Sequence, residues 1–331
     1  MTPVFAAALK DRELRIVITG ANGWLGHTTL AMLEEVFGDG VGARVSLFGS
    51  RAREIETPGG RLIACKPLSE MGDLPAAPTL LLHFAFETKD RVAGYSLNDF
   101  VARNAAIDDM VLASADRFSP IGVFVPSSGA VYGPDKALER NLEANPYGYM
   151  KVCQEERWAT WVSRRTCTLV CTRVFNLAGP YINKFDTYAL ASILLNLLRD
   201  EPIMLRADKP IIRSYVYTRD LMRLVLALML DPGARSLAPF DTVGAEEIEI
   251  GDLAKRAAAV IGRPDHPVER PPIVAGPVNR YVGEGSVWGE LLVHYGISPT
   301  PLDVQIVNTA AYMKAAGITR PPSHSSHTNL L

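Results

Sequence analysis

The chain has 331 residues, of which 48% are hydrophobic and 21% are charged, an ordinary composition for a globular protein. Its 34 Lys and Arg against 36 Asp and Glu give a net charge of −2, which argues against nucleic-acid and polybasic membrane-binding surfaces. The longest apolar helical run, residues 221–230, is about half of the roughly 20 residues that a membrane span needs. We therefore expect neither nucleic acid nor a membrane as a partner.

The N-terminal residues 1–9 lack the basic and cleavage regions of a signal peptide. The four cysteines, at positions 65, 153, 167 and 171, form no CxxC pair and are interpreted as reduced core thiols rather than disulfides or metal ligands. The six histidines are scattered, so no metal site is expected. Together these features predict a cytoplasmic location.

Short apolar runs alternate with helical patterns through the first half of the chain. The strand-like runs are 14–19, 44–48, 80–84, 121–126 and 168–175, and the main helical patterns are 24–37, 92–118 and 147–162. Strands that alternate with helices in this way predict a doubly wound parallel sheet with helices on both faces, as in a Rossmann-like α/β fold.

The pattern changes after residue 176, where Gly179-Pro180 marks a break. Helical patterns follow at 189–198, 221–230 and 302–316, and the Pro-rich stretch 263–277 is typical of a surface loop. We predict a dinucleotide-binding domain over 1–176, to which segments near 215–245 return. Residues 177–318 are expected to form mainly a smaller α/β substrate-binding domain, and 319–331 a flexible tail.

A glycine-rich turn, GANGWLG at residues 20–26, follows the first predicted strand and opens the first predicted helix. Gly20 and Gly23 allow the backbone to approach a diphosphate closely, and Gly26 allows the helix to pack tightly on the strand. The free N–H groups and positive dipole end of the helix favour phosphate. This context predicts dinucleotide binding, whereas the alternative is a plain tight turn.

The end of the second predicted strand indicates which dinucleotide binds. An acidic side chain there would bind the adenosine ribose hydroxyls and repel a 2′-phosphate, but this chain has Ser50, Arg51 and Arg53 instead. These side chains can bind a phosphate, so NADP is favoured over NAD. The alternative is that both arginines are solvated loop charges.

Ser128, Tyr147 and Lys151 form a candidate catalytic group. Ser128 follows a predicted strand, and the spacing of four places Tyr147 and Lys151 on one face of a helix. A nearby lysine ammonium and an oxidised nicotinamide favour the tyrosine phenolate, while a serine hydroxyl can hold the substrate oxygen. Two other tyrosines are less suitable as the catalytic tyrosine. Tyr149 has no lysine at the matching spacing, and Tyr132 is expected to shape the loop after the strand.

At this point the chain resembles the extended, nucleotide-sugar-modifying branch of the short-chain dehydrogenase/reductase superfamily, over nearly its whole length. The resemblance rests on ITGANGWLG, HFAF, SSGAVYG, PYGYMK, TRVFNLAGP, RSYVYTRDL and NRYV, which occur in this order. It implies a Rossmann-like domain with a smaller C-terminal substrate domain. Homodimers, formed through the helices near 92–118 and 147–163, are also implied.

The resemblance implies that Ser128, Tyr147 and Lys151 are catalytic. Expected cofactor contacts come from Gly20, Asn22, Gly23, Trp24, Leu25, Gly26, Ser50, Arg51, Arg53, Phe84, Ala85, Asn104, Tyr147 and Lys151. Expected substrate contacts come from Ser128, Asn176, Arg213 and Arg280, the two arginines pairing with a diphosphate. The alternative for Arg213 is an ion pair with Asp220, and His83 is expected to be a packing residue.

Two departures from the family pattern narrow the expected activity. Gly129 and Ala130 stand where many dehydratases carry an Asp-Glu pair, and no Asp follows the second strand as in many NAD-retaining 4-epimerases. We therefore predict an NADPH-dependent 4-keto-sugar reductase acting on a nucleotide-linked sugar. The alternatives are a 4-epimerase with tightly bound NAD and a non-catalytic dinucleotide-binding protein.

Overall fold

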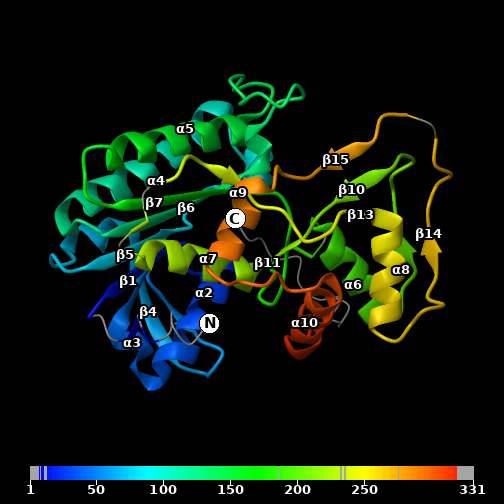
Figure 1. The fold of residues 1–331 in the computed structure, drawn as a ribbon, viewed down its shortest axis with the longest axis horizontal. Coiled ribbons are helices and arrows are strands. Elements are labelled where there is room, and N and C mark those ends of the chain that lie inside the picture. Colours follow the sequence, from blue (N-terminus) through cyan, green and yellow to red (C-terminus); the bar gives the residue numbers. More distant parts are fainter. Residues whose placement is uncertain are drawn as a thin grey trace. The chain divides into compact units, whose positions relative to one another are not determined.

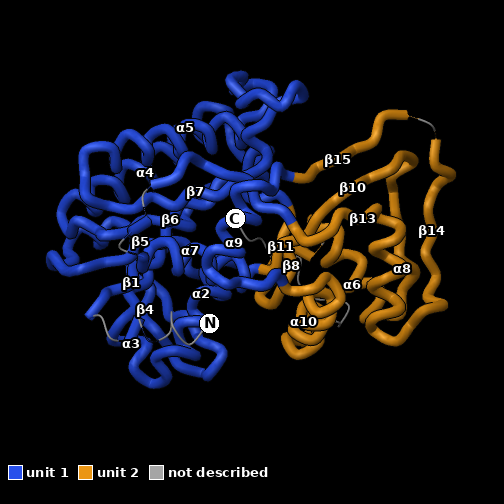
Figure 2. The backbone as a smooth tube through the Cα atoms, viewed as in Figure 1, with its two compact units in different colours: residues 1–175, 218–243, 283–299 blue, residues 176–217, 244–282, 300–331 orange. Residues whose placement is uncertain are grey.

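The computed structural model describes residues 7, 9–10, 13–185, 187–231, 233–234, 236–274 and 276–318, so the predicted tail at 319–331 lies outside the described residues. The chain divides into two compact units (Figure 2). Unit 1 comprises Met1–Phe175, Thr218–Val243 and Gly283–Pro299, and unit 2 comprises Asn176–Tyr217, Gly244–Val282 and Thr300–Leu331. The return of a segment near 215–245 was expected, whereas the return of Gly283–Pro299 has no clear sequence signal.

Unit 1 is built on an eight-stranded sheet with the order β12-β7-β6-β5-β1-β2-β4-β3. All neighbouring strands are parallel except β3, which runs antiparallel to β4 at the edge. The strands are β1 (Arg15–Thr19), β2 (Val45–Gly49), β3 (Arg53–Glu56), β4 (Leu62–Pro67), β5 (Thr79–His83), β6 (Gly122–Ser128), β7 (Thr168–Val174) and β12 (Phe240–Asp241). This confirms the predicted doubly wound α/β fold class.

Helices cover both faces of this sheet (Figure 1). The helices α4 and α5 pack together over one face, and α2 and α7 pack together over the other. The helices of unit 1 are α2 (Trp24–Phe37), α3 (Val41–Arg44), α4 (Leu97–Phe118), α5 (Pro146–Val162), α7 (Thr218–Leu230) and α9 (Ser286–His294). None of the helices that the structure describes is long and apolar enough to cross a membrane.

One hydrophobic core of unit 1 lies between the sheet and the α4–α5 layer. Every residue of β5 is buried, as expected for a central strand covered on both faces. Trp158 of α5 is fully buried and packs in one cluster with Leu81 of β5 and Phe118 of α4. Burial of this apolar surface is the main stabilising contribution to the unit.

Several elements, among them β3 and β4 at one side of the sheet, have no counterpart in the sequence prediction. The strands β3 and β4 form a short hairpin whose residues alternate between buried and exposed. The helices α8 (Ile250–Val260) and α9 are also absent from the prediction, and α4 begins at Leu97 after a separate 3₁₀ turn, Lys89–Gly94. Ser96 caps α4 by accepting a hydrogen bond from the Asp99 N–H, which fixes this start.

The described part of unit 2 combines three small sheets with three helices. The sheet β13-β10-β15 contains Ile248–Glu249, Ile211–Arg213 and Asn279–Tyr281. The pairs β8 (Leu177–Ala178) with β11 (Val216–Tyr217) and β9 (Ile203–Met204) with β14 (Val268–Glu269) are parallel. The helices α6 (Ala189–Arg199), α8 and α10 (Leu302–Ala315) contact one another.

The close contact between Gly26 of α2 and the preceding turn can be tested by the substitution Gly26→Ala. A methyl group at Gly26 would lie 2.4 Å from the carbonyl oxygen of Ala21, which is backbone and cannot move aside cheaply. We expect Gly26→Ala to lower the free energy of unfolding in urea by about 1–3 kcal/mol. Gly42→Ala is the matched control, because Gly42 lies in α3 with open space around it, and it should be neutral or slightly stabilising. Equal stability of the two variants would contradict the prediction.

Candidate active site

The candidate site lies at the carboxyl end of β1, where the strand order reverses. The strands β1 and β5 are neighbours, although β2, β3 and β4 come between them in sequence. Open α/β sheets bind ligands at such a switch point. The Gly20 turn leaves β1 here, and residues Phe84 and Ala85 leave β5 beside it.

Gly20 is required at this position for two reasons. Its φ of 67° lies in the left-handed region, and a Cβ there would lie 2.7 Å from the Ala85 nitrogen. The Gly20 N–H donates to the Phe48 carbonyl at the end of β2, and its carbonyl accepts from Gly23. The turn, which follows β1, is thereby held against the ends of β2 and β5.

The start of α2 is suited to an anion. Its N-cap is Gly23, which provides no side-chain cap, and the first turn of the helix contains no acidic residue. The glycine cradle and uncapped helix start therefore fit a dinucleotide diphosphate. Asn22 is exposed, while Leu25 is half-buried and Trp24 is buried.

The end of β2 presents polar and basic groups. Ser50 and Arg51 are exposed, and Arg53 at the start of β3 is half-buried. Arg53 pairs with Cys65 through the β3–β4 backbone ladder, and among the residues that the structure describes no side-chain hydrogen bond or ion pair is found for Arg51 or Arg53. Both guanidinium groups are thus available to an anion at this edge.

The end of β6 and the start of α5 are connected through Asn145 and Gly148. Asn145 caps α5 by accepting from the Gly148 N–H at 2.9 Å, and it donates to the Ala130 carbonyl at 2.8 Å. A Cβ on Gly148 would lie 2.0 Å from that same carbonyl, so the helix approaches the loop very closely. Ser128, which ends β6 and accepts from the Ala130 N–H, is thereby held near the turn of α5 that carries Tyr147.

Tyr147 and Lys151 share an aromatic neighbour, Phe86. The Phe86 and Tyr147 rings meet edge to face with centroids 5.9 Å apart, and the Lys151 nitrogen lies 3.7 Å from the centre of the Phe86 ring. Lys151 donates to the Pro126 carbonyl at 2.8 Å and to Gln154 Oε1 at 2.9 Å. The structure therefore brings the predicted tyrosine and lysine together at the end of β6.

Burial dominates the electrostatics of Lys151. The residue is 4% exposed, and this desolvation lowers its pKa from 10.5 to about 8. The carboxylates of Asp108 and Glu155 and the thiol of Cys171 act in the opposite direction. A buried ammonium with a pKa this close to neutrality is typical of functional sites.

Asn104 is fully buried in α4 and holds the loop after β5. Its Oδ1 accepts from the Glu87 N–H at 2.8 Å, and its amide nitrogen donates to the Phe100 carbonyl. Any contribution of Asn104 to the site acts through this loop.

Gly129, one of the two positions where many dehydratases carry an acid–base pair, has no space for a larger side chain. A Cβ on Gly129 would lie 2.4 Å from the Phe175 ring, so no larger side chain fits there without displacing this ring. The neighbouring Tyr132 is held in a separate network, donating to Asp241 and accepting from Arg173, both at 2.8 Å.

The predicted substrate-contacting residues Asn176, Arg213 and Arg280 belong to unit 2. Asn176 donates to the Ser214 and Tyr281 carbonyls, and Arg213 donates to Ile212 and Asn279. Arg280 forms two hydrogen bonds with Glu247, so an anion would compete with this carboxylate. Asp220, suggested as an alternative partner of Arg213, pairs with Arg223.

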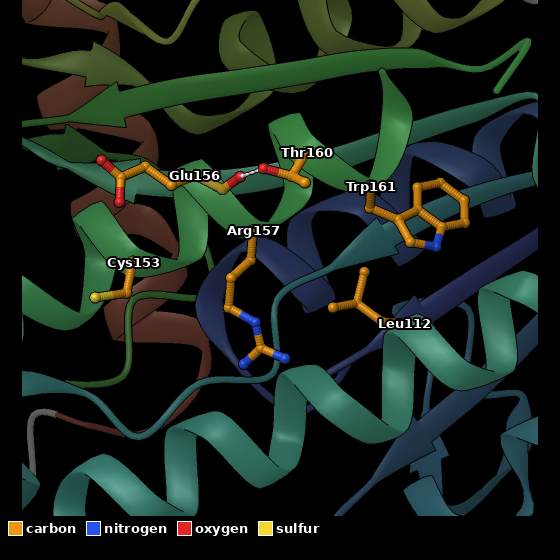
Figure 3. Close-up of a pocket in the computed structure, with 6 residues that line it drawn as sticks. All are labelled: Leu112, Cys153, Glu156, Arg157, Thr160 and Trp161. Carbon is orange, nitrogen blue, oxygen red and sulfur yellow. Dashed lines mark hydrogen bonds between the residues drawn. The ribbon is translucent and has the colours of Figure 1, made fainter. Parts of the chain in front are cut away.

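A surface hollow lies between α4 and α5 (Figure 3). Cys153, Glu156, Arg157, Thr160 and Trp161 of α5 and Leu112 of α4 line it. Of these α5 positions, Cys153, Glu156, Arg157 and Thr160 lie on a different helix face from the candidates at 147 and 151, and Trp161 lies about 20 Å along the helix from Tyr147. The hollow is therefore separate from the candidate active site.

Residues 16–237 match the model of the NAD dependent epimerase/dehydratase family. The chain belongs to this family. It is 23% identical over 205 residues to UDP-glucose 4-epimerase of Mycoplasma genitalium, a match that covers 54% of this chain and 60% of that relative.

Solved structures of similar fold include other epimerases. UDP-N-acetylglucosamine 4-epimerase from Methanobrevibacter ruminantium M1, in complex with UDP-N-acetylmuramic acid, superposes with a TM-score of 0.72 at 16% identity, covering 91% of this chain and 98% of that one. UDP-glucuronic acid 4-epimerase from Bacillus cereus, in complex with UDP-glucuronic acid and NAD, superposes with a TM-score of 0.69 at 18% sequence identity. This match covers 91% of this chain and 99% of that one. These likenesses confirm the predicted fold of this family member.

The sequence prediction missed several residues that shape the site. Phe86, Asp108, Asn145, Gly148 and Gln154 all contact catalytic candidates or their supports. Phe86 and Gly148 lie within the motifs HFAF and PYGYMK, and Asn145 precedes a proline, which is a typical helix start, whereas Asp108 and Gln154 have no local signal.

The buried charge of Lys151 predicts a pH-dependent stability. Below about pH 8 the ammonium is charged in both states, and the native state bears the cost of burying it. Between pH 8 and 10.5 the folded protein releases the proton while the unfolded chain keeps it, so stability rises with pH. From about pH 7 to about pH 10, the unfolding free energy of wild type relative to Lys151→Met should increase by about 2–3 kcal/mol.

Urea unfolding at the two pH values measures this difference. Lys66→Met is the control, because Lys66 is exposed on β4 and its replacement should leave the pH dependence unchanged. Parallel pH profiles for wild type and Lys151→Met would contradict the prediction.

Proposed function

We propose that this family member is an NADP(H)-dependent oxidoreductase that reduces a keto group, at C4, on a nucleotide-linked sugar. The observation that carries the proposal is that Lys151 binds the Pro126 carbonyl of β6 while Phe86, in the loop after β5, contacts both Tyr147 and Lys151. The strand β5 is the neighbour of β1, which ends at the Gly20 turn. Arg51, in the turn after β2, and Arg53, at the start of β3, can bind a 2′-phosphate and support NADP over NAD. The closed position at Gly129 argues against a dehydratase that uses an acid at that site.

The proposed roles follow from the chemistry of the side chains. Ser128 would donate a hydrogen bond to the keto oxygen and polarise it, and Tyr147 would transfer its phenolic proton to that oxygen. The Lys151 ammonium would stabilise the phenolate that remains and bind the ribose hydroxyls of the cofactor. When bound, the nicotinamide would supply the hydride. Asn176, Arg213 and Arg280 of unit 2 are the proposed sugar and diphosphate contacts.

Tyr147→Phe tests the proton-transfer role. We expect turnover of a nucleotide-linked 4-keto-6-deoxyhexose with NADPH to fall by about 10²–10⁴-fold, because the general acid is lost while the ring remains. Cofactor affinity, measured by fluorescence titration, should change little. Tyr149→Phe is the matched control, since this tyrosine lies two residues further along α5 and should be dispensable. Full turnover by the Tyr147 variant would refute the role.

Arg51→Ala tests the preference for NADP. Loss of a charge-assisted contact to the 2′-phosphate should weaken NADPH binding about tenfold and leave NADH binding unchanged, as measured by calorimetry. Arg164→Ala removes an exposed arginine from the turn after α5 and serves as the control. An equal loss for both cofactors would instead indicate a general structural effect.

A 4-epimerase with retained NAD is the second candidate. It is favoured by the names of the relatives, among which the Bacillus cereus enzyme was solved with NAD. Such an enzyme would use the same three residues to oxidise C4 and then reduce the other face of the rotated sugar. Nucleotide released by denaturing the purified protein distinguishes the candidates: near-stoichiometric NAD(H) favours the epimerase, and empty protein that prefers NADPH favours the reductase.

Two further expectations stay predictions. The α4–α5 surface, including the hollow of Figure 3, is the proposed homodimer interface, and analytical ultracentrifugation would test it. A cytoplasmic location is likewise proposed from cysteine usage alone.

A further inference from the structure

A series of buried polar side chains extends from Lys151 on α5, by way of α4, to β5 in the sheet. Lys151 donates to Gln154 Oε1 at 2.9 Å, and Gln154 donates to Asp108 Oδ1 at 2.8 Å. His83 Nε2 lies 2.9 Å from the same carboxylate oxygen. These four residues are each at most 4% exposed, and they come from α5, α4 and β5.

The hydrogen bonds in this network indicate that Asp108 is ionised. Burial alone would raise the pKa of Asp108, but hydrogen bonds from His83 and Gln154, with the nearby Lys151 ammonium, hold it below its ordinary value. Asp108 is therefore a carboxylate that accepts from Gln154 and from the Nε2–H of His83. The other imidazole nitrogen, Nδ1, lies 2.7 Å from the Thr19 hydroxyl.

The network of polar side chains ends beside the Gly20 turn. The Thr19 hydroxyl oxygen accepts from the Ala85 N–H at 3.2 Å, and Ala85 is the residue whose backbone a side chain on Gly20 would strike. The buried network thus connects the switch point of the sheet with the catalytic lysine.

Asp108 is the carboxylate near Lys151 that no arginine neutralises. Glu155, on α5, is bound by Arg173 through two hydrogen bonds of 2.9 and 2.7 Å. Burial raises the pKa of the Cys171 thiol on β7, so this group is uncharged. Tyr147 on α5 and His83 on β5 are the other titratable groups that flank the lysine or its partners.

We propose that Asp108, Gln154 and His83 are positioning residues that hold the Lys151 ammonium charged and fixed in orientation. This inference rests on the proposed function, in which the ammonium stabilises the Tyr147 phenolate. Two of its hydrogens go to Pro126 and Gln154, and the ring of Phe86 lies beside the nitrogen. Asp108 supplies the negative charge that opposes the ammonium. Gln154 bridges the two groups by accepting from Lys151 and donating to Asp108, and His83 holds the Asp108 carboxylate in place.

The test is a direct titration of Lys151 by NMR on protein labelled with ¹³C at lysine Cε. The Lys151 signal is the one that Lys151→Met removes, and its wild-type midpoint is expected at about 8. Asp108→Asn keeps the shape of the side chain and removes its charge, so the midpoint should fall by about one unit or more. Gln154→Met should also lower it, because the ammonium loses an acceptor.

Asp109→Asn is the matched control. Asp109 is the next residue of α4, is exposed and pairs with Arg157, so its loss should leave the Lys151 midpoint in place. Because the titration needs neither substrate nor cofactor, it can fail while the proposed reaction stands, and the reverse holds too. If substrate turnover is measurable, the acidic limb of the oxidative pH profile should move to higher pH in Asp108→Asn.

Several outcomes would overturn the inference. An unchanged Lys151 midpoint in either folded network variant would do so, and so would an equal shift in Asp109→Asn. If Asp108→Asn does not fold, Gln154→Met decides the matter alone. Loss of folding in both variants would assign the network a structural role and also count against the proposal.

Discussion

The close approach of the Gly20 turn to the end of β5 is the constraint on which the site depends. A single Cβ at Gly20 would lie 2.7 Å from the Ala85 nitrogen, so two neighbouring strands can end side by side only with glycine there. This contact leaves the start of α2 beside the switch point of the sheet. Everything proposed for the cofactor follows from that placement.

The position of α5, which carries the candidate residues Tyr147 and Lys151, depends on a second close approach. Gly148 lets α5 lie against the Ala130 carbonyl, and Asn145 binds that carbonyl while capping the helix. The spacing between Ser128 at the end of β6 and Tyr147 on α5 is therefore set by the contacts that Asn145 and Gly148 make with Ala130.

Burial of Lys151 illustrates how function and stability oppose each other here. Removing an ammonium from water costs folding free energy, and the structure offsets part of this cost with two acceptors and a nearby carboxylate. A charge in such a low-dielectric environment acts more strongly on a neighbouring phenol than it would in water. The same burial that destabilises the fold would thus strengthen the proposed action of Lys151 on Tyr147.

The sequence by itself determined the alternating α/β pattern, the Gly20–Gly26 turn and the pairing of Tyr147 with Lys151, because these depend on local periodicity and short spacing. The short edge strands, the return of Gly283–Pro299 to unit 1 and the Asp108–Gln154 network were decided only by the tertiary structure. Each depends on residues far apart in the chain that meet through packing, and no local pattern records which distant partners a side chain will contact.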